Sequence, residues 1–358
     1  MSRMPELQYM FIYLGWQCNL NCKHCWVPKD QYELTAQLTE SMIDECLKFA
    51  KQMNVKSIKI SGGEPMLHKE NVEKIIKFAK EHGVFVSIET NGTLIDKKFV
   101  ENNCYERLSY SVSIDSPEAK IHNDFRGSEF AFEKSVDAIK HIIDNGMGCG
   151  VTYSTYDGNE NCIDRMIRFC KNNGVKHMKI NPIVKMGRAE NFDDNYSMTT
   201  ISPEKILQLY SKYCLQEQNG VNVSIMVPPA FSGLYFLKDI SRKNPENICS
   251  NCPTFNILSI LPNGDVGLCA EAYRSNDLKF GNINQQSLDD IWSGEKMKQF
   301  RNSLFCNLEG VCGACQVKEI CWGGCRAIAL KKYGRVNAPN PFCHEMKEKG
   351  KFFLSGKR

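Results

Sequence analysis

The feature that most constrains this chain is a triplet of cysteines near its start, Cys18, Cys22 and Cys25. The triplet follows an apolar run over residues 10–14, so a strand leading into a loop would bring three thiols toward one point. A structural zinc ion or a closed iron–sulfur cube takes four ligands, whereas a cube held by three cysteines leaves one iron free for an outside ligand. On spacing alone, the triplet fits an iron–sulfur cluster, part of a zinc site or coincidence.

Composition favours metal ligation over disulfides. The chain has 358 residues and 18 cysteines, with no secretory signal at its start and no apolar run long enough to span a bilayer. We therefore expect a cytoplasmic protein with reduced thiols. The net charge of +4 is small for this length, so we expect neither a nucleic-acid partner nor a membrane partner.

Strand-like and helix-like segments alternate along the first two thirds of the chain. Apolar runs of strand length lie at 9–14, 56–60, 84–88, 107–114, 148–155, 176–183 and 221–227. Helical periodicity lies between them, at 39–53, 70–82, 130–145, 160–173 and 203–218. Repeated βα units predict a parallel sheet with helices outside, in an open or closed barrel, with its sites at the carboxyl ends of the strands.

Cysteine distribution indicates a second domain, because nine of the cysteines follow residue 248. We expect a barrel over 1–227, a connector rich in proline over 228–248, a cysteine-rich domain over 249–345 and a basic tail over 346–358.

Polar and glycine-rich motifs follow the next strands. Ser61-Gly62-Gly63-Glu64-Pro65 follows the second, Glu89-Thr90-Asn91-Gly92 ends the third, and Ser113 ends the fourth, with Asp115, His122 and Arg126 beyond it. Glycines allow close approach of a backbone to a ligand, although an ordinary glycine turn before a helix would look the same.

Taken in this order, the motifs resemble those of the radical S-adenosylmethionine (SAM) enzymes over about residues 9–227. The resemblance implies a partial (β/α)6 barrel and a [4Fe–4S] cluster on Cys18, Cys22 and Cys25, whose open iron is chelated by SAM. It places Gly62, Gly63, Glu64 and Pro65 near the methionyl amino group, Glu89, Asn91 and Ser113 near the ribose and methionyl part, Arg126 at the SAM carboxylate and Trp26 near the adenine. Asp115 and His122 could equally cap local turns.

The later cysteines resemble the SPASM extension of radical SAM enzymes over about 249–345. Without that context, their C-x2-C and C-x3-C spacings would suit zinc as readily as iron. The resemblance implies two auxiliary [4Fe–4S] clusters, one on Cys249, Cys252, Cys269 and Cys325, the other on Cys312, Cys315, Cys321 and Cys343. Either Cys249 or Cys252 alone would satisfy the spacing. Cys306 is left over as a structural thiol, and the six cysteines within predicted elements are expected in the core: Cys46, Cys104, Cys149, Cys162, Cys170 and Cys214.

The family likeness implies an oxidoreductase that cleaves SAM reductively to a 5′-deoxyadenosyl radical and abstracts a substrate hydrogen, with an electron donor such as ferredoxin or flavodoxin. We expect the substrate to be a ribosomally made peptide that is oxidised or cross-linked, with a small molecule such as a porphyrinoid, quinone precursor or sugar as the alternative. Only seventeen residues precede Cys18, so a peptide substrate would call for a separate leader-binding protein or for direct recognition in the barrel mouth.

Two further possibilities rank lower. Sulfatase-maturing relatives carry an Asp directly after the cysteine that Cys269 resembles, and here Ala270 and then Glu271 follow it. Glu271 is the candidate base, and no catalytic residue is otherwise identified. A zinc-binding interaction module would be colourless, and it would not explain why a three-cysteine site precedes Gly-Gly-Glu-Pro at the head of a βα series.

Overall fold

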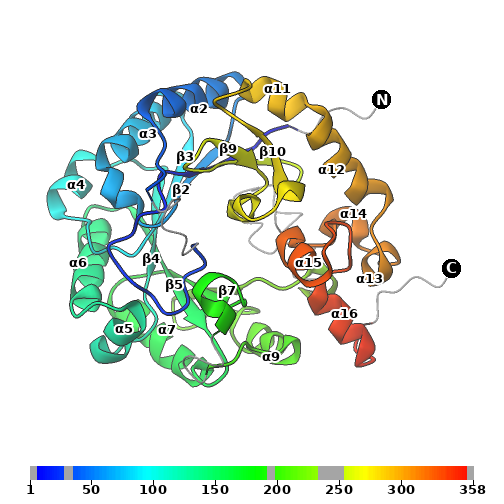
Figure 1. The fold of residues 1–358 in the computed structure, drawn as a ribbon. Coiled ribbons are helices and arrows are strands. Elements are labelled where there is room, and N and C mark those ends of the chain that lie inside the picture. Colours follow the sequence, from blue (N-terminus) through cyan, green and yellow to red (C-terminus); the bar gives the residue numbers. More distant parts are fainter. Residues whose placement is uncertain (1–5, 28–34, 192–197, 233–253, 353–358) are drawn as a thin grey trace.

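The computed structural model describes residues 6–27, 35–191, 198–232 and 254–352, and its strands form a single ten-stranded sheet that curves into an open barrel (Figure 1). The strand order is β10-β9-β8-β1-β2-β3-β4-β5-β6-β7. The strands are β1 (Tyr9–Tyr13), β2 (Ser57–Ser61), β3 (Phe85–Thr90), β4 (Leu108–Ser113), β5 (Gly148–Thr155), β6 (His177–Pro182), β7 (Asn222–Ile225), β8 (Ile257–Ile260), β9 (Asp265–Gly267) and β10 (Lys279–Asn282).

The first seven strands pair in parallel with their sequence neighbours, as a βα barrel requires. Each begins within one residue of the start that the sequence predicts. The predicted partial barrel is therefore confirmed, and the carboxyl ends of these strands meet at one rim.

The cysteine-rich part of the chain continues the same sheet. β8 pairs in parallel with β1, with Tyr9 opposite Ile257 and Ile12 opposite Ile260, and β9 and β10 follow as antiparallel strands. Its short helices then complete the ring beside the barrel (Figure 1).

Helices cover the outside of the barrel (Figure 1). They are α2 (Glu40–Gln52), α3 (Lys69–His82), α4 (Lys97–Asn102), α5 (Ala119–Arg126), α6 (Ala131–Asp144), α7 (Ile163–Asn172) and α9 (Pro203–Tyr213), followed in the cysteine-rich part by α11 (Leu288–Ser293), α12 (Glu295–Cys306), α13 (Gly310–Gly313), α14 (Lys318–Cys321), α15 (Arg326–Tyr333) and α16 (Pro341–Glu348). The five predicted helices are confirmed, although the 203–218 segment ends at Tyr213. The sequence did not predict α4 and α5, which are six and eight residues long.

The two faces of the barrel strands differ sharply. Side chains that face the helices are wholly buried, for example Ile58, Val86 and Ile180, each with 0% exposure. Their neighbours on the inner face, such as Ser87 and Thr152, are small, polar and partly exposed. Solvent therefore reaches the inside of the barrel along these strands.

The six cysteines that were expected in the core are only partly found there. Cys46, Cys170 and Cys214 are buried, and Cys149 and Cys162 are partly buried. The prediction for Cys104 was wrong: it is exposed, in the turn after α4, where its thiol hydrogen-bonds to the carbonyl of Val100 at 3.3 Å. Because α4 is short, the chain leaves the protein interior before this residue.

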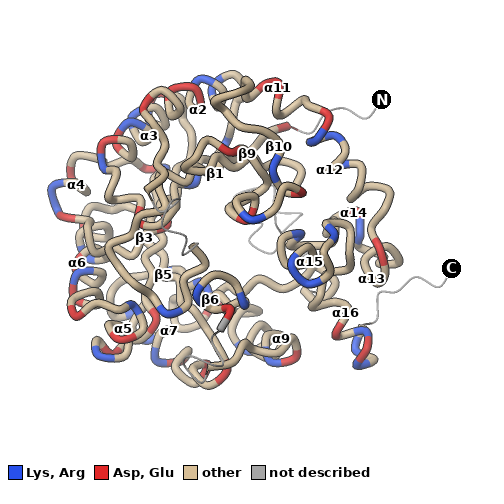
Figure 2. Tube along the Cα trace, in the orientation of Figure 1, with Lys and Arg blue, Asp and Glu red and all other residues tan. Residues whose placement is uncertain are grey.

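Lys and Arg alternate with Asp and Glu over the outer helices (Figure 2). Among the described residues, no helix has the length and apolar character needed to cross a bilayer.

Candidate functional site

The cysteine loop leaves β1 at the carboxyl rim of the barrel, and the Gly-Gly-Glu-Pro loop docks directly onto it. The backbone N–H of Gly63 donates to the carbonyl of Gly15 at 2.8 Å, and that of Glu64 donates to the carbonyl of Gln17 at 2.8 Å. A Cβ on Gly63 would lie 2.1 Å from the Gln17 oxygen. Gly62 has a φ of +140°, and its Cβ would lie 2.4 Å from the Gly15 oxygen. Only glycine permits this close contact between the two backbones.

The Glu64 side chain ties this loop to the end of β3. It is buried, and its carboxylate accepts hydrogen bonds from the Thr90 hydroxyl at 2.7 Å, the Asn91 backbone N–H at 2.8 Å and the Met66 backbone N–H at 3.0 Å. Burial raises the pKa of this carboxyl, and the hydrogen bonds act in the opposite direction. Pro65 is also buried and begins the short 3₁₀ turn η1 (Pro65–His68).

N–H donors point at two of the three cysteine sulfurs. The Sγ of Cys18 accepts from the Leu20 backbone N–H at 3.4 Å and from the Asn91 side-chain amide at 3.8 Å. The Sγ of Cys22 accepts from Nη1 of Arg126 at 3.8 Å. Burial raises the pKa of the Cys22 thiol, and the Arg126 charge opposes that effect. Donors of this kind suit a sulfur that carries negative charge, as a metal-bound thiolate does.

The donor set is compatible with an iron–sulfur cluster. Within the described part of the chain, no three His, Cys, Asp or Glu residues gather closely enough to hold one metal ion. The ligands of a cube bind different irons and so lie farther apart than those of a single ion. A three-cysteine loop with N–H donors aimed at its sulfurs is therefore compatible with such a cluster.

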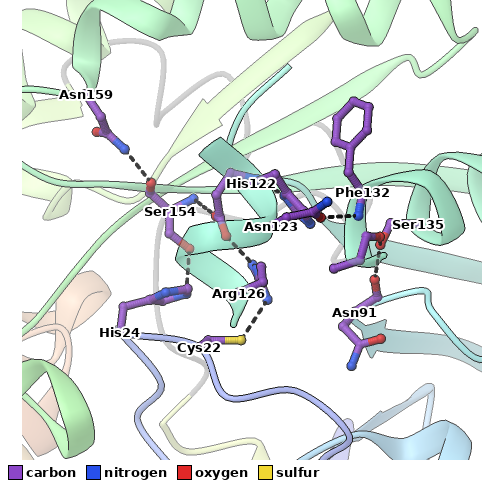
Figure 3. A network of polar contacts seen from close by, with 12 residues as sticks. Cys22, His24, Asn91, His122, Asn123, Arg126, Phe132, Ser135, Ser154 and Asn159 are labelled. Atoms are coloured by element: carbon purple, nitrogen blue, oxygen red, sulfur yellow. Dashed lines mark hydrogen bonds and ion pairs between the residues drawn. The ribbon is translucent and has the colours of Figure 1, made fainter. Parts of the chain in front are cut away.

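Arg126 lies at the centre of a buried polar network (Figure 3). Its Nε is 2.6 Å from Oδ2 of Asp115, and both side chains are buried. The other oxygen of Asp115 accepts the backbone N–H of Ser154 at 2.9 Å. Burial alone would raise the pKa of Asp115, but Arg126 outweighs it and lowers the pKa to about 2. The network fixes the guanidinium between β4, β5 and the cysteine loop.

Two histidines belong to the same network, and sequence reasoning did not assign either to the site. His24 lies within the cysteine motif, stacks on Phe125 with ring centroids 4.5 Å apart, and its Nε2 is 3.2 Å from the Ser154 hydroxyl. His122 accepts the Asp115 backbone N–H on Nδ1 at 3.1 Å. Burial lowers the pKa of each imidazole to about 4, so both are neutral at pH 7. The position of His24 between Cys22 and Cys25 was the available signal.

The remaining strand-end residues take separate positions. The Asn91 amide contacts both Cys18 and the Asn19 side chain, at 2.9 Å from Asn19 Oδ1. Glu89 lies on the inner face, where its carboxylate accepts from Ser61 at 3.1 Å. Ser113 ends β4, opposite Thr152. Of the three, Asn91 alone has a hydrogen bond to a cysteine sulfur among the described contacts.

Trp26 packs among aromatic rings just after the triplet. Its ring meets that of Trp16 edge-on at 5.9 Å and that of Tyr13 at 6.1 Å. Its carbonyl accepts from Nη2 of Arg274 at 3.0 Å. A Cβ on Gly187 would lie 2.7 Å from the Trp26 Cα, so the turn η3 (Gly187–Asn191) also presses on this loop.

Four predicted ligands of the cysteine-rich part affect one another electrostatically. Cys312, Cys315, Cys321 and Cys343 are all buried. Burial raises the pKa of Cys343, and the three other thiols raise it further. Cys312, Cys315 and Cys343 belong to one buried cluster. The backbone N–H of Asn340 donates to the Cys312 sulfur at 3.2 Å.

The other predicted set is described only in part. Cys269 and Cys325 are half-buried, whereas Cys249 and Cys252 lie outside the described residues. Glu271, in the turn η5 (Ala270–Tyr273), is close enough to raise the pKa of Cys325, and burial raises its own pKa. Cys306 is exposed at the end of α12.

An open parallel barrel with a three-cysteine loop docked on a glycine loop at its rim has the architecture that the resemblance to radical SAM enzymes implies. The model of the radical SAM superfamily matches residues 12–170, and that of the SPASM iron–sulfur cluster-binding domain matches residues 249–316. The chain belongs to the radical SAM superfamily, in its SPASM subgroup, and is an enzyme that binds SAM and iron–sulfur clusters.

Known proteins of two kinds resemble it. It is 27% identical to an AdoMet-dependent heme synthase of Methanosarcina barkeri, over 96% of this chain and 97% of the relative. It is 24% identical to the antilisterial bacteriocin subtilosin biosynthesis protein AlbA of Bacillus subtilis, over 89% and 69%. The structure of Streptococcus suis SuiB bound to S-adenosylmethionine shares its fold, with a TM-score of 0.72 and 19% identity over 94% of this chain and 77% of SuiB.

Proposed function

We propose that this enzyme uses the cysteine triplet and the adjoining strand ends to cleave SAM reductively and to abstract a hydrogen atom from its substrate. The observation that carries the proposal is the docking of the Gly-Gly-Glu-Pro loop onto the cysteine loop, with N–H donors aimed at Cys18 and Cys22. A cluster on Cys18, Cys22 and Cys25 would supply one electron to SAM; cleavage of the S–C5′ bond would release methionine and leave a 5′-deoxyadenosyl radical to take the substrate hydrogen.

The chain's own residues position and shield this chemistry. SAM would be held by Gly62, Gly63, Glu64, Pro65, Glu89, Asn91, Ser113, Arg126 and Trp26. Asp115 orients Arg126, so that the guanidinium faces the Cys22 sulfur. Its remaining N–H groups would then bind the SAM carboxylate. The Glu64 carboxylate accepts a hydrogen bond from the Asn91 backbone at the end of β3 and so keeps Asn91 beside Cys18.

We also propose two auxiliary [4Fe–4S] clusters, for three clusters in all. One would be held by Cys249, Cys252, Cys269 and Cys325, and the other by Cys312, Cys315, Cys321 and Cys343. The latter four cysteines are all buried, and three of them raise the pKa of the fourth, Cys343; both observations support the second set. Glu271, half-enclosed near Cys325, is the candidate base.

A ribosomally made peptide is the first candidate substrate, and the likeness to AlbA and to the fold of SuiB, which is also known bound to the precursor peptide SuiA, supports it. A carboxylate-bearing small molecule of the tetrapyrrole class is the second, supported by the heme synthase relative and by cationic side chains inside the barrel described below. We place the enzyme in the cytoplasm, with a ferredoxin- or flavodoxin-like electron donor and, for a peptide substrate, a separate leader-binding protein.

The test is anaerobic incubation of reconstituted protein with SAM and dithionite, followed by measurement of 5′-deoxyadenosine. We expect release by the parent protein, and none by the variant in which Cys18, Cys22 and Cys25 are Ala, while that variant keeps its auxiliary iron. Cleavage retained in the triple variant, or a colourless zinc-containing protein without cleavage, would overturn the proposal.

A further inference from the structure

The inner face of the parallel strands is mostly small and polar, and it carries an excess of positive charge. Register places Lys59 of β2 level with Phe11 and Ser87, and Lys179 of β6 level with Thr152 and Ser224. The third charged residue on this face of β1–β7 is Glu89. Two ammonium groups and one carboxylate leave a net charge of +1 on this face of β1–β7.

Solvent reaches these side chains although the strands are internal. The Lys59 side chain is 21% exposed and that of Glu89 is 38% exposed. The opposite faces of the same strands have 0% exposure at Ile58, Ile60 and Ile88. Since helices cover that outer face, the exposed area of Lys59 and Glu89 opens to the inside of the barrel, where a substrate would lie.

Glu89 is already committed to Lys59. Nζ of Lys59 is 3.4 Å from Oε1 of Glu89 and lies 3.8 Å from the centre of the Phe11 ring, and the Ser61 hydroxyl donates to the other carboxylate oxygen at 3.1 Å. Burial alone would raise the pKa of Glu89, but the charges of Lys59 and Lys179 lower it, and the net pKa lies below its ordinary value. Lys179 therefore acts on the same carboxylate through space.

Within the described ranges, Lys179 has no direct partner of its own. Its ammonium makes no hydrogen bond or ion pair with any residue that the structure describes, although its side chain is only partly exposed. A partly enclosed ammonium loses hydration, and an anion placed beside it would restore the lost stabilisation. The nearby His177 cannot supply an anion, because an imidazole is either neutral or cationic. Its Nε2 is 3.1 Å from the Ser224 hydroxyl, and burial, aided by Lys179, lowers its pKa.

We propose that Lys179 forms a subsite for a carboxylate of the substrate inside the barrel, with Lys59 of β2 on the same inner face. Lys179 lies three residues before Pro182, the last residue of β6, which is about 10 Å along the strand. The carboxylate would thus lie below the cysteine loop, and the rest of the substrate would extend from it toward the rim. This inference rests on the proposed function and adds to it the chemical class of the substrate.

The experiment measures binding to anaerobic, SAM-loaded holoenzyme with two pairs of probes. One pair is coproporphyrin III, which carries four carboxylates, and its tetramethyl ester. The other is a dansylated, C-terminally amidated pentapeptide with two glutamates, and its glutamine counterpart. The pair that shows a preference for free carboxylates identifies the source of the carboxylate.

We expect at least one free-carboxylate probe to bind about tenfold more tightly than its neutral counterpart, and Lys179→Gln to remove most of that preference. Lys176→Gln is the matched control, because Lys176 lies three residues earlier and is exposed. Equal binding of free and neutral probes in both pairs, or an unchanged preference in Lys179→Gln, would overturn the proposal. Weaker binding of SAM itself by Lys179→Gln would also overturn it, by assigning the lysine to SAM. Since binding is read without turnover, failure of SAM cleavage would count against the proposed function alone.

Discussion

Nε of Arg126 lies 2.6 Å from Oδ2 of Asp115, and the same guanidinium is 3.8 Å from the sulfur of Cys22. A buried carboxylate thus holds a buried cation against one of the three cysteines. The arrangement orients the arginine before any ligand arrives, and it makes Cys22 electrostatically different from Cys18, whose sulfur accepts from neutral N–H groups.

Removing either partner of this pair leaves an uncompensated charge in the interior. We expect Arg126→Gln and Asp115→Asn each to lower the free energy of unfolding by about 3–5 kcal/mol, and the double variant to lose less than the sum. Anaerobic urea unfolding of all four proteins gives the coupling. Neutralising Lys140 and Asp137, an exposed pair at 3.5 Å, should cost less than about 1 kcal/mol. Strictly additive effects at Arg126 and Asp115 would contradict the prediction.

Gly63→Ala should displace the cysteine loop, because the new Cβ would meet the Gln17 oxygen at 2.1 Å. We expect the purified variant to lose about four irons per chain while the auxiliary iron remains. Iron analysis after reconstitution measures this. Gly150→Ala is the control, since its Cβ would have no neighbour closer than 3.5 Å. Full iron content in Gly63→Ala would show that the loop tolerates the shift.

Acid should destabilise the fold through His122. Its pKa is about 4 because of burial, below the ordinary value of 6.5, so the unfolded chain binds more protons between these two values. The contribution of the neutral ring is complete above pH 6.5 and is lost as the pH falls toward 4. From pH 7.5 to 5.5 we expect a loss of about 1 kcal/mol from this residue. His24 acts in the same direction.

His122→Asn tests the assignment, because an amide oxygen can accept the Asp115 backbone N–H without titrating. Urea unfolding at the two pH values should show a smaller decline for the variant than for the parent protein. An identical decline would assign the pH dependence to other groups.

Arg274 joins the cysteine-rich part to the cysteine loop through the Trp26 carbonyl and is also within 3.4 Å of Glu190. Arg274→Ala should speed backbone hydrogen exchange in residues 18–27 by about tenfold, since a charge-assisted hydrogen bond to that loop is lost. Lys331→Ala removes only a contact with Glu190, at 2.7 Å, and should leave exchange in 18–27 unchanged. Equal effects of the two variants on hydrogen exchange would contradict direct stabilisation of the cysteine loop by Arg274.

Sequence patterns predicted the barrel because long apolar runs and amphipathic helices repeat with clear periods. They missed α5, whose eight residues are too few to display a period, and with it the buried positions of His122 and Arg126. The parallel pairing of β8 with β1 joins residues about 250 positions apart, for example Tyr9 and Ile257, and no local pattern encodes it.

The candidate site, too, could be predicted from the sequence only in part. The motifs identified which residues belong to the rim, yet the glycines of Gly-Gly-Glu-Pro contact the cysteine loop, and Arg126 has Asp115 as its partner. Such pairings depend on how loops meet in space. The resemblance to SPASM extensions likewise predicted two later sets, of which Cys312, Cys315 and Cys343 share one buried cluster; the ligand sets stay a prediction.

The pairing of β8 with β1 has a practical consequence for dissecting this enzyme. A chain shortened to residues 1–227 would strip β1 of the neighbour that now covers Tyr9–Ile12. Its bare N–H and C=O groups would recruit strands from other molecules, so the isolated barrel would aggregate instead of reporting on SAM chemistry. Expression trials should therefore keep the two regions in one polypeptide and disable either by point substitution.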